Sequence, residues 1–314
     1  MADQFDSWLD TRPVDEGPAE GELLPGTRIG VCKIVALLGR GGFAEVYRGE
    51  DADGRPVAIK ILHQLDDKSR ARFELETKIL LEIQHPNFPR MLSFGSCGER
   101  PYVVMELLKP YEMPRGDRSV ARFLRTVISA VGALHRHGYV HRDIKPSNIL
   151  MRTNGDPVLV DFGLACPLSQ IERDKNALSV DGQAKVGVGT YGYSAPEQFS
   201  GQNVGREADV HAVGMLIREC FDGELPKGWR SVYLTATNSD PATRYRTVEK
   251  LGEAIRRRHW RRTAIAVVGF VVLLVLGALI WADVSEHLAD SQVKPVVERD
   301  PLPSHKGMTA CRNS

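Results

Sequence analysis

Two short motifs in the middle of the chain constrain its fold more than any other feature. Residues 141–148 read His-Arg-Asp-Ile-Lys-Pro-Ser-Asn, and Asp161 opens an Asp-Phe-Gly triplet 13 residues after Asn148. The first motif places a carboxylate, an ammonium group and an amide close together, and the second adds another carboxylate. The probability that both motifs occur in this order by chance is negligible, so we expect the fold to bring these groups into one site.

The residue types in the two motifs match the needs of phosphoryl transfer. That reaction requires a group that accepts the proton of the nucleophile, cations that neutralise developing charge, and hard oxygen ligands for magnesium. Asp143 suits the first role, and Lys145 can contact the transferred phosphate. Asn148 and Asp161 supply oxygen atoms for the metal. The motifs therefore predict a metal-assisted phosphoryl transfer.

A glycine-rich segment at residues 38–46, Leu-Gly-Arg-Gly-Gly-Phe-Ala-Glu-Val, lies between two predicted strands. Glycines there let backbone amides approach phosphates with no side chain in between, although any glycine-rich hairpin fits this segment by itself. It is not a Walker A loop, because no Gly-Lys-Ser/Thr follows. It is not a dinucleotide fingerprint either, because a strand follows instead of a helix. Ala44 stands where a third glycine would be.

Lys60 lies in an apolar run, Val57–Leu62, that reads as a strand. An unpaired ammonium group would be costly to bury there. A predicted helix at 69–84 offers a partner, because Glu76 shares its apolar face, whereas Glu74 is turned roughly 200° away at 3.6 residues per turn. We therefore expect a buried Lys60–Glu76 ion pair; the alternative is two separately solvated charges.

The apolar patterns predict an α+β fold. Residues 27–107 alternate short strand-like runs with turn signals, and after residue 115 the apolar residues recur at helical spacing until about Gly138. A small sheet-rich lobe followed by a larger helical lobe, with a cleft between them, is the implied arrangement. The strands are expected at 34–38, 46–49, 57–62, 91–94 and 102–105, and the helix of the small lobe at 69–84.

With these motifs, residues from about 28 to 255 resemble a eukaryotic-type (Hanks-type) protein kinase domain, most closely that of bacterial membrane Ser/Thr kinases. The resemblance implies the bilobal kinase fold, with an N-lobe over about 28–107 and a C-lobe over about 108–255. It implies ATP and Mg²⁺ as cofactors, with Mn²⁺ as a substitute, and protein Ser/Thr hydroxyls as acceptors. The Lys145-Pro146 dipeptide resembles Ser/Thr kinases rather than tyrosine kinases.

The resemblance also gives each site residue an expected role. Lys60 holds the α- and β-phosphates, Glu76 is its helix partner, and Met105 is the gatekeeper beside the hinge. Asp143 and Lys145 are catalytic, Asn148 and Asp161 bind the metal, and Leu80, Met91, His141 and Phe162 match the apolar stack of active kinases. The residues expected to bind ATP are Leu38, Gly39, Gly41, Gly42, Phe43, Val46, Ala58, Lys60, Met105, Glu106, Leu107 and Leu150.

Three positions of the C-lobe match structural parts of the family. Residues 189–197 match the end of the activation segment. Glu197 is expected to pair with Arg244, and Asp209 is expected to anchor the catalytic loop. Only 34 residues separate Asp209 from Thr243, fewer than the family normally has. A helix that often docks substrates is therefore expected to be absent or reduced.

The activation segment departs from the family at its primary phosphorylation site. Arg142 beside Asp143 usually accompanies control by a phosphate that orders this loop. The familiar position, four residues before Thr190, is Val186. Ser179 and, further upstream, Ser169 are alternative sites, and a loop ordered without phosphate is the other interpretation.

Residues 263–282 contain no charge and are rich in Val, Leu, Ile and Ala, so they predict a single transmembrane helix. Five arginines crowd into 256–262, which places the kinase domain in the cytoplasm and the tail 283–314 outside. Residues 1–27 read as an acidic flexible leader with no signal peptide. Localisation in the cell membrane, with the lipid bilayer as a partner, is the resulting expectation.

Composition excludes few function classes, but it argues against nucleic acid as a partner and favours reduced cysteines. The chain has 41 Lys and Arg against 40 Asp and Glu, so nothing indicates nucleic acid as a partner. Its five cysteines are scattered, as in a reduced cytosolic domain. The function expected is a signalling kinase that also phosphorylates itself through self-association. One alternative is a pseudokinase scaffold. Another is a small-molecule kinase, and the full activation segment disfavours this second alternative.

Overall fold

The computed structural model describes residues 23–171, 190–200 and 204–292, with the side chains of 259–269, 283 and 286–292 excluded. The chain divides into two compact units, 1–259 and 260–314. Most of the predicted leader, Ser179 and Val186 lie outside the described residues.

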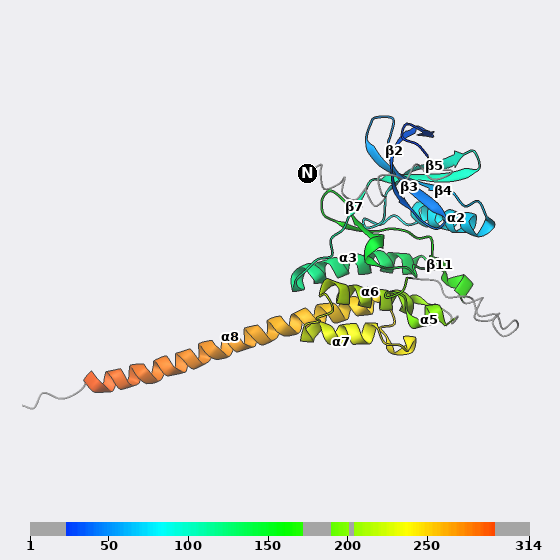
Figure 1. Ribbon diagram of the computed structural model, residues 1–314. Coiled ribbons are helices and arrows are strands. Elements are labelled where there is room, and N and C mark those ends of the chain that lie inside the picture. Colours follow the sequence, from blue (N-terminus) through cyan, green and yellow to red (C-terminus); the bar gives the residue numbers. More distant parts are fainter. Residues whose placement is uncertain (1–22, 172–189, 201–203, 293–314) are drawn as a thin grey trace, which may run out of the picture. The chain divides into compact units, whose positions relative to one another are not determined.

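The N-lobe is built on a six-stranded antiparallel sheet with the order β1-β2-β3-β4-β6-β5 (Figure 1). All five predicted strands are present, each somewhat longer than its apolar run because backbone pairing continues past the buried side chains. The strands are β1 (Arg28–Ile29), β2 (Cys32–Arg40), β3 (Ala44–Glu50), β4 (Pro56–Leu62), β5 (Met91–Cys97) and β6 (Arg100–Glu106).

One helix, α2 (Asp67–Glu82), accompanies the sheet. It begins two residues before the predicted helix because Asp66 caps it: the carboxylate accepts a hydrogen bond from the Ser69 amide at 3.1 Å. Its buried face carries Phe73, Glu76, Ile79 and Leu80. Glu74 is exposed, as its position on the helix predicts.

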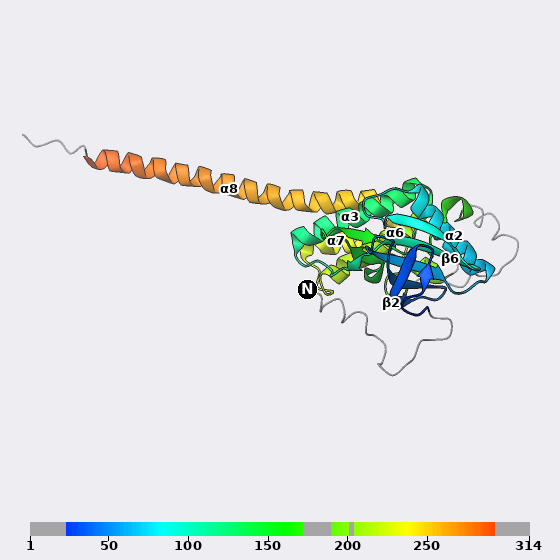
Figure 2. The same ribbon diagram turned by 90° about the horizontal axis from the view of Figure 1, so that it is seen from above.

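The C-lobe is helical, as expected. Its long helix α3 (Asp117–Arg136) packs on α6 (Arg206–Cys220) (Figures 1 and 2). The remaining elements of the C-lobe are β7 (Lys109–Pro110), β8 (Tyr139–Val140), η1 (Pro146–Asn148), β9 (Ile149–Met151), β10 (Pro157–Leu159), β11 (Cys166–Pro167), α5 (Pro196–Phe199), α7 (Lys227–Ala236), η2 (Pro241–Thr243) and the start of α8 (Val248–Gln292).

The late C-lobe is short. Residues 221–240, all of them described, contain the single helix α7, which packs on α6. Trp229 of α7 is fully buried and donates a hydrogen bond to Asp117 at 2.6 Å. The absence or reduction of a substrate-docking helix relative to the family stays a prediction.

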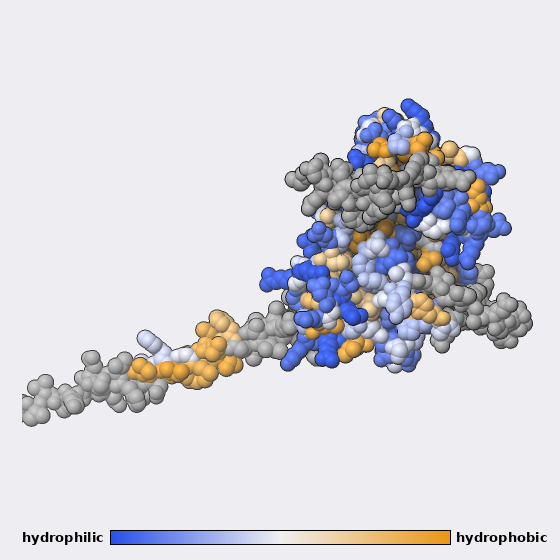
Figure 3. Space-filling view, viewed as in Figure 1, coloured by the Kyte–Doolittle hydropathy of each residue, from blue (hydrophilic) through white to orange (hydrophobic). Residues whose placement is uncertain are grey.

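In the second unit, α8 continues to Gln292 and exposes the apolar side chains of 270–281, including Phe270 and Trp281 (Figure 3). Within the part of the chain whose side chains are described, no helix is long and apolar enough to span a membrane. The side chains of 263–269, which begin the predicted span, lie outside that part.

The four described cysteines, Cys32, Cys97, Cys166 and Cys220, are free thiols. The reduced state predicted from their scattered positions stays a prediction. Cys311 lies outside the described residues.

Candidate active site

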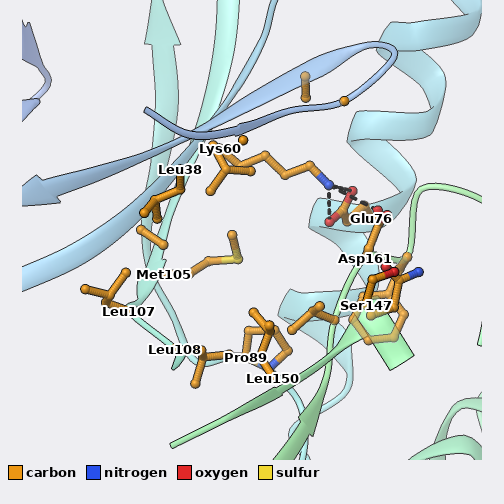
Figure 4. A pocket seen from close by; sticks show the side chains of 18 of the residues that line it. Leu38, Lys60, Glu76, Pro89, Met105, Leu107, Leu108, Ser147, Leu150 and Asp161 are labelled. Atoms are coloured by element: carbon orange, nitrogen blue, oxygen red, sulfur yellow. Dashed lines mark hydrogen bonds and ion pairs between the residues drawn. The ribbon is translucent and has the colours of Figure 1, made fainter. Parts of the chain in front are cut away.

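The predicted ion pair of the N-lobe is present. The Lys60 ammonium group, on β4, lies 2.7 Å from both carboxylate oxygens of Glu76 on α2. A second carboxylate, that of Asp161, lies 3.3 Å away across the lobes. Figure 4 shows the lysine joined to both acidic side chains at one end of a pocket. Strand β4 and helix α2 thus place the Lys60 ammonium group beside Asp161 of the second motif.

The electrostatics of this group favour the ionised forms of Lys60 and Asp161. Burial lowers the pKa of Lys60, but the charges of Glu76 and Asp161 outweigh it and hold the pKa well above its usual range. The same attraction lowers the pKa of Asp161 against the opposing effect of burial. Burial raises the pKa of Glu76, and the charge of Lys60, 2.7 Å from both its oxygens, opposes that effect.

Asp143 lies at the centre of a second group of contacts. The Lys145 ammonium group is 2.8 Å from its Oδ2, and the Asn148 amide donates to the same oxygen at 3.0 Å. The Thr190 hydroxyl donates to Asp143 Oδ1 at 2.7 Å and accepts from Lys145 at 2.8 Å. The catalytic motif and the end of the activation segment therefore meet at one carboxylate.

Asp209 anchors this catalytic loop, as predicted. Its fully buried carboxylate accepts hydrogen bonds from the backbone amides of His141 and Arg142, both at 2.9 Å, and contacts the His135 ring at 2.7 Å. Burial alone would raise the pKa of Asp209, but these donors hold it below its usual range. Arg142 has a φ of 69° and Asp161 one of 64°, so the backbone is strained on both sides of the site.

Phe162 is completely buried in the core that also contains Leu80 and against which Met91 packs. Its ring centre lies 5.3 Å from that of His141 and 4.9 Å from that of Phe88. The four residues of the predicted apolar stack are thus in or against one core. This packing holds Asp161, the neighbour of Phe162, toward the pocket.

A cavity of about 620 Å³ lies between the lobes, a size typical of small-molecule sites. Phe43 of the glycine hairpin closes one side: a Cβ on Gly163 would meet its ring at 2.7 Å, so the ring would have to move for any larger residue there. The cavity is lined by all twelve residues predicted to bind ATP, namely Leu38, Gly39, Gly41, Gly42, Phe43, Val46, Ala58, Lys60, Met105, Glu106, Leu107 and Leu150, and also by Glu76, Lys145, Asn148 and Asp161.

Asp143 does not line this cavity but contacts Lys145 and Asn148, which do. Sequence reasoning missed other lining residues, among them Pro89, Ser147 and Val160. It also gave Thr190 no role at the catalytic carboxylate. The position of Thr190, seven residues before Glu197, was the one sequence signal for this role. The contact of Thr190 with Asp143 depends on how the loop folds back.

Hard oxygen atoms remain available for a divalent cation. The Asn148 amide nitrogen donates to the backbone carbonyl of Asp143 at 2.8 Å and to its carboxylate, which leaves the Asn148 carbonyl oxygen for another partner. One oxygen of Asp161 contacts Lys60, and its side chain is 42% exposed. This donor set fits the oxygen preference of magnesium.

The second predicted ion pair closes the activation segment. The Arg244 guanidinium holds both oxygens of Glu197 at 2.7 and 2.8 Å, and both residues are buried. Arg244 also donates to the carbonyl of Glu207 at 2.9 Å. The pair ties the end of the segment to the C-lobe core.

Comparison with known proteins agrees with this architecture. The family described as protein kinase domain matches residues 32–258. The probable serine/threonine-protein kinase PknB of Lactococcus lactis is 33% identical over 207 residues, 62% of this chain and 32% of that protein. The DNA damage-responsive serine/threonine-protein kinase RqkA of Deinococcus radiodurans is 37% identical over 220 residues, 65% of this chain and 32% of that protein.

The serine/threonine-protein kinase PknD of Mycobacterium tuberculosis is 35% identical over 234 residues, 69% of this chain and 34% of that protein. The chain thus spans about a third of the length of these relatives. A match over residues 32–258, together with the lobes, the ion pairs and the catalytic loop, establishes the family. The chain belongs to the protein kinase family, among the bacterial Hanks-type Ser/Thr kinases.

Proposed function

We propose that this protein transfers the γ-phosphate of ATP to Ser or Thr hydroxyls of proteins. One observation carries the proposal: Lys60, Asp161, Lys145 and Asn148 line a single cavity, and the last two hold Asp143 beside it. A cation for phosphate, oxygen ligands for a metal and a proton-accepting carboxylate are the parts that phosphoryl transfer needs. The relatives named above carry serine/threonine-protein kinase in their names.

In the proposed mechanism, Lys60 orients the α- and β-phosphates while Glu76 keeps its ammonium group in place. Asn148 and Asp161 would hold the magnesium ion, which neutralises phosphate charge when bound. Asp143 accepts the proton of the attacking hydroxyl, and Lys145, 2.8 Å from it, stabilises the charge on the transferred group.

Adenine would lie at the other end of the cavity. Val46, Ala58 and Leu150 offer apolar contacts to its faces, and the backbone at Glu106 and Leu107 offers hydrogen bonds to its edge. Leu38 and the glycines 39, 41 and 42 cover the nucleotide, with Phe43 at the tip. Met105 limits the depth of the pocket.

The choice of Ser/Thr as acceptors is supported by Lys145-Pro146 and by Thr190, which bridges Lys145 and Asp143. The chain itself is included among the proposed substrates, through self-association of two copies. Ser169 and Ser179 are the proposed positions in the activation segment. Signal transduction is the corresponding role.

We also propose a membrane anchor. Residues 263–282 are free of charge over a length that matches the hydrocarbon core of a bilayer, with Trp260 and Trp281 near the two ends. The arginines of 256–262 favour a cytoplasmic kinase domain and an outer tail. A protease-protection assay on intact and opened membrane vesicles tests this. In intact vesicles the protease should cut only one of the two parts, the kinase domain or the tail 283–314, and in opened vesicles it should cut both.

Phosphate transfer is tested with the full chain, radiolabelled ATP and magnesium. Label should appear on Ser or Thr in the wild type and be lost in Asp143→Asn, which keeps the shape of the side chain but cannot accept the proton. Equal labelling of both proteins would contradict the catalytic role of Asp143. ATP binding without transfer in the wild type would leave the pseudokinase alternative.

A further inference from the structure

Arg152 of the C-lobe follows β9 directly, two residues after Leu150 of the adenine pocket, and its guanidinium contacts the N-lobe. Its Nε and Nη2 hold both carboxylate oxygens of Glu106, at distances between 2.6 and 3.2 Å. The same Nη2 donates to the carbonyl of Phe88 at 2.8 Å, and Nη1 donates to the carbonyl of Pro86. One side chain of the C-lobe thus holds the hinge and the loop after α2.

The hinge carboxylate has a second anchor on the same loop. The backbone amide of Arg90 donates to Glu106 Oε1 at 2.8 Å, and the Glu106 amide donates to the Arg90 carbonyl at 3.0 Å. Only 23% of the Arg152 side chain and 18% of the Glu106 side chain are exposed, so solvent screens this pair less than a surface ion pair. A bidentate pair of this kind also fixes geometry.

The loop reached by Arg152 supports the metal side of the site. The ring of Phe88 packs edge-on against Phe162 at 4.9 Å, and Phe162 precedes Gly163 in the motif that begins with Asp161. Asn87 of the same loop donates to the Pro157 carbonyl at 2.8 Å and accepts from the Leu159 amide at 2.9 Å. Contacts therefore run without a gap from the hinge through Arg152 and Phe88 to Phe162.

We propose that Arg152 is a positioning residue for the nucleotide. Arg152, Glu106 and the carbonyls of Pro86 and Phe88, which we call the hinge clamp, hold the adenine-binding hinge in register with the loop that supports Phe162. Breaking the clamp leaves the hinge tied to this loop mainly by the backbone bond between Glu106 and Arg90, so ATP must order more of the hinge when it binds. The inference rests on the proposed kinase function and adds a residue to it.

Arginine is required at this position because one planar guanidinium donates five hydrogen bonds in fixed directions, three to Glu106 and two to backbone carbonyls. A lysine offers a single charged point and cannot reach Glu106 and both carbonyls together. Arg152→Lys should therefore restore only part of the ATP affinity that Arg152→Gln loses. Glu106→Gln removes the charge of the hinge partner and leaves the hinge backbone unchanged.

The test measures Mg-ATP affinity by titration calorimetry, and KM and kcat by phosphate transfer, in the full chain. Arg152→Gln and Glu106→Gln should each raise Kd and KM for ATP about tenfold, as expected for a lost charged hydrogen-bond partner, with kcat changed less. The double variant should be no worse than either single variant, because both break the same clamp. Arg115→Gln is the matched control: Arg115 also holds a carboxylate and a carbonyl, Asp222 and Glu219, both at 2.7 Å, but away from the pocket.

Several outcomes overturn the proposal. Wild-type Kd in both single variants, additive losses in the double variant, or an equal loss in Arg115→Gln would each contradict the clamp. A lower melting temperature with unchanged Kd per folded molecule would make Arg152 a merely structural residue. If Arg152→Gln fails to fold, Glu106→Gln gives the answer. Failure of the wild type to bind Mg-ATP would overturn the proposed function and the clamp together, whereas unchanged variants of an active wild type overturn the clamp alone.

Discussion

Two buried ion pairs of similar geometry serve different ends in this protein. Lys60 and Glu76 meet at 2.7 Å in the N-lobe, and Arg244 and Glu197 meet at 2.7 Å in the C-lobe. All four residues are buried. The pairs differ in what else their cations touch. This difference separates a pair built for chemistry from a pair built for stability.

Arg244 is saturated by the protein. Besides Glu197, it donates to the carbonyls of Asn238 at 2.6 Å, Glu207 at 2.9 Å and Ser239 at 3.3 Å. Removing either partner would leave a buried charge with no water to replace it. The Arg244–Glu197 pair is therefore a structural ion pair that joins the activation segment to the helical core.

Lys60 has a different surrounding. Its third acceptor is Asp161, which is partly exposed, and both residues line the cavity. An ammonium group is a point charge on a flexible stem, so it can serve an incoming phosphate without breaking its contact to Glu76. Burial of a charge alone does not reveal function; an open space beside it does.

The largest effect is expected for Lys60→Met. Loss of the phosphate-orienting charge should lower the rate of phosphate transfer by about a thousandfold, the upper range for one positioned electrostatic contact. The free energy of unfolding should change less than in the Arg244 variants, because Glu76 borders a cavity that admits water. Rate measurements and urea denaturation on the same preparation check both. A collapse of stability with normal rates per folded molecule would reverse the comparison.

Arg244→Met should show the opposite pattern. It leaves Glu197 buried and unpaired, so the free energy of unfolding should fall by about 3 kcal/mol. The folded fraction should retain phosphate transfer within about a factor of three, since the pair lies outside the cavity. Chemical denaturation followed by intrinsic fluorescence gives the first value. An inactive but fully stable variant would contradict the structural assignment of this pair.

Arg244→Lys sharpens the same point at a smaller scale. Lysine keeps the charge opposite Glu197 but loses the planar fork, so at least two of the hydrogen bonds to carbonyls are lost. We expect a destabilisation of about 1–2 kcal/mol, between the wild type and Arg244→Met. The same denaturation experiment measures it. Stability equal to the wild type would mean that charge alone holds the segment.

The smallest effect is expected from pH. The folded pKa of Lys60 is raised above its ordinary 10.5, so its contribution is present below that value and lost only as the pH rises through the higher folded pKa. The folded pKa of Asp161 is lowered from 3.8, so its contribution is present above 3.8 and lost as the pH falls through the lower folded pKa.

Mg-ATP affinity should therefore show no transition from these two groups between about pH 5 and 9. Titration calorimetry across this range checks the expectation. A transition near neutral pH that disappears in Lys60→Met would show that the lysine loses its proton there.

Local pattern was enough for much of this site. The face of α2 that carries Glu76 follows from helical spacing, and the strand of Lys60 follows from its apolar neighbours, so their meeting could be anticipated. The predicted start of α2 was wrong by two residues, because the cap at Asp66 decides where the helix begins. Residue type and order alone identified the catalytic loop.

Two contacts between distant segments were not predicted, although the family resemblance had indicated others, such as that of Arg244 with Glu197. Thr190 lies 47 residues from Asp143, and Arg152 lies 46 residues from Glu106, with no periodicity linking either pair. Glu106 was expected at the hinge for its backbone, whereas its side chain carries the contact to Arg152. Such pairs depend on how loops fold back, which single-sequence patterns do not encode.

The central claim is that Asp161 and Lys60 face one nucleotide and its metal. It is tested most directly by titrating ATP into the full chain and into Asp161→Asn, each with and without magnesium. The wild type should bind ATP more tightly with magnesium, and Asp161→Asn should lose most of that gain while still binding the nucleotide. The same magnesium dependence in both proteins would contradict the account.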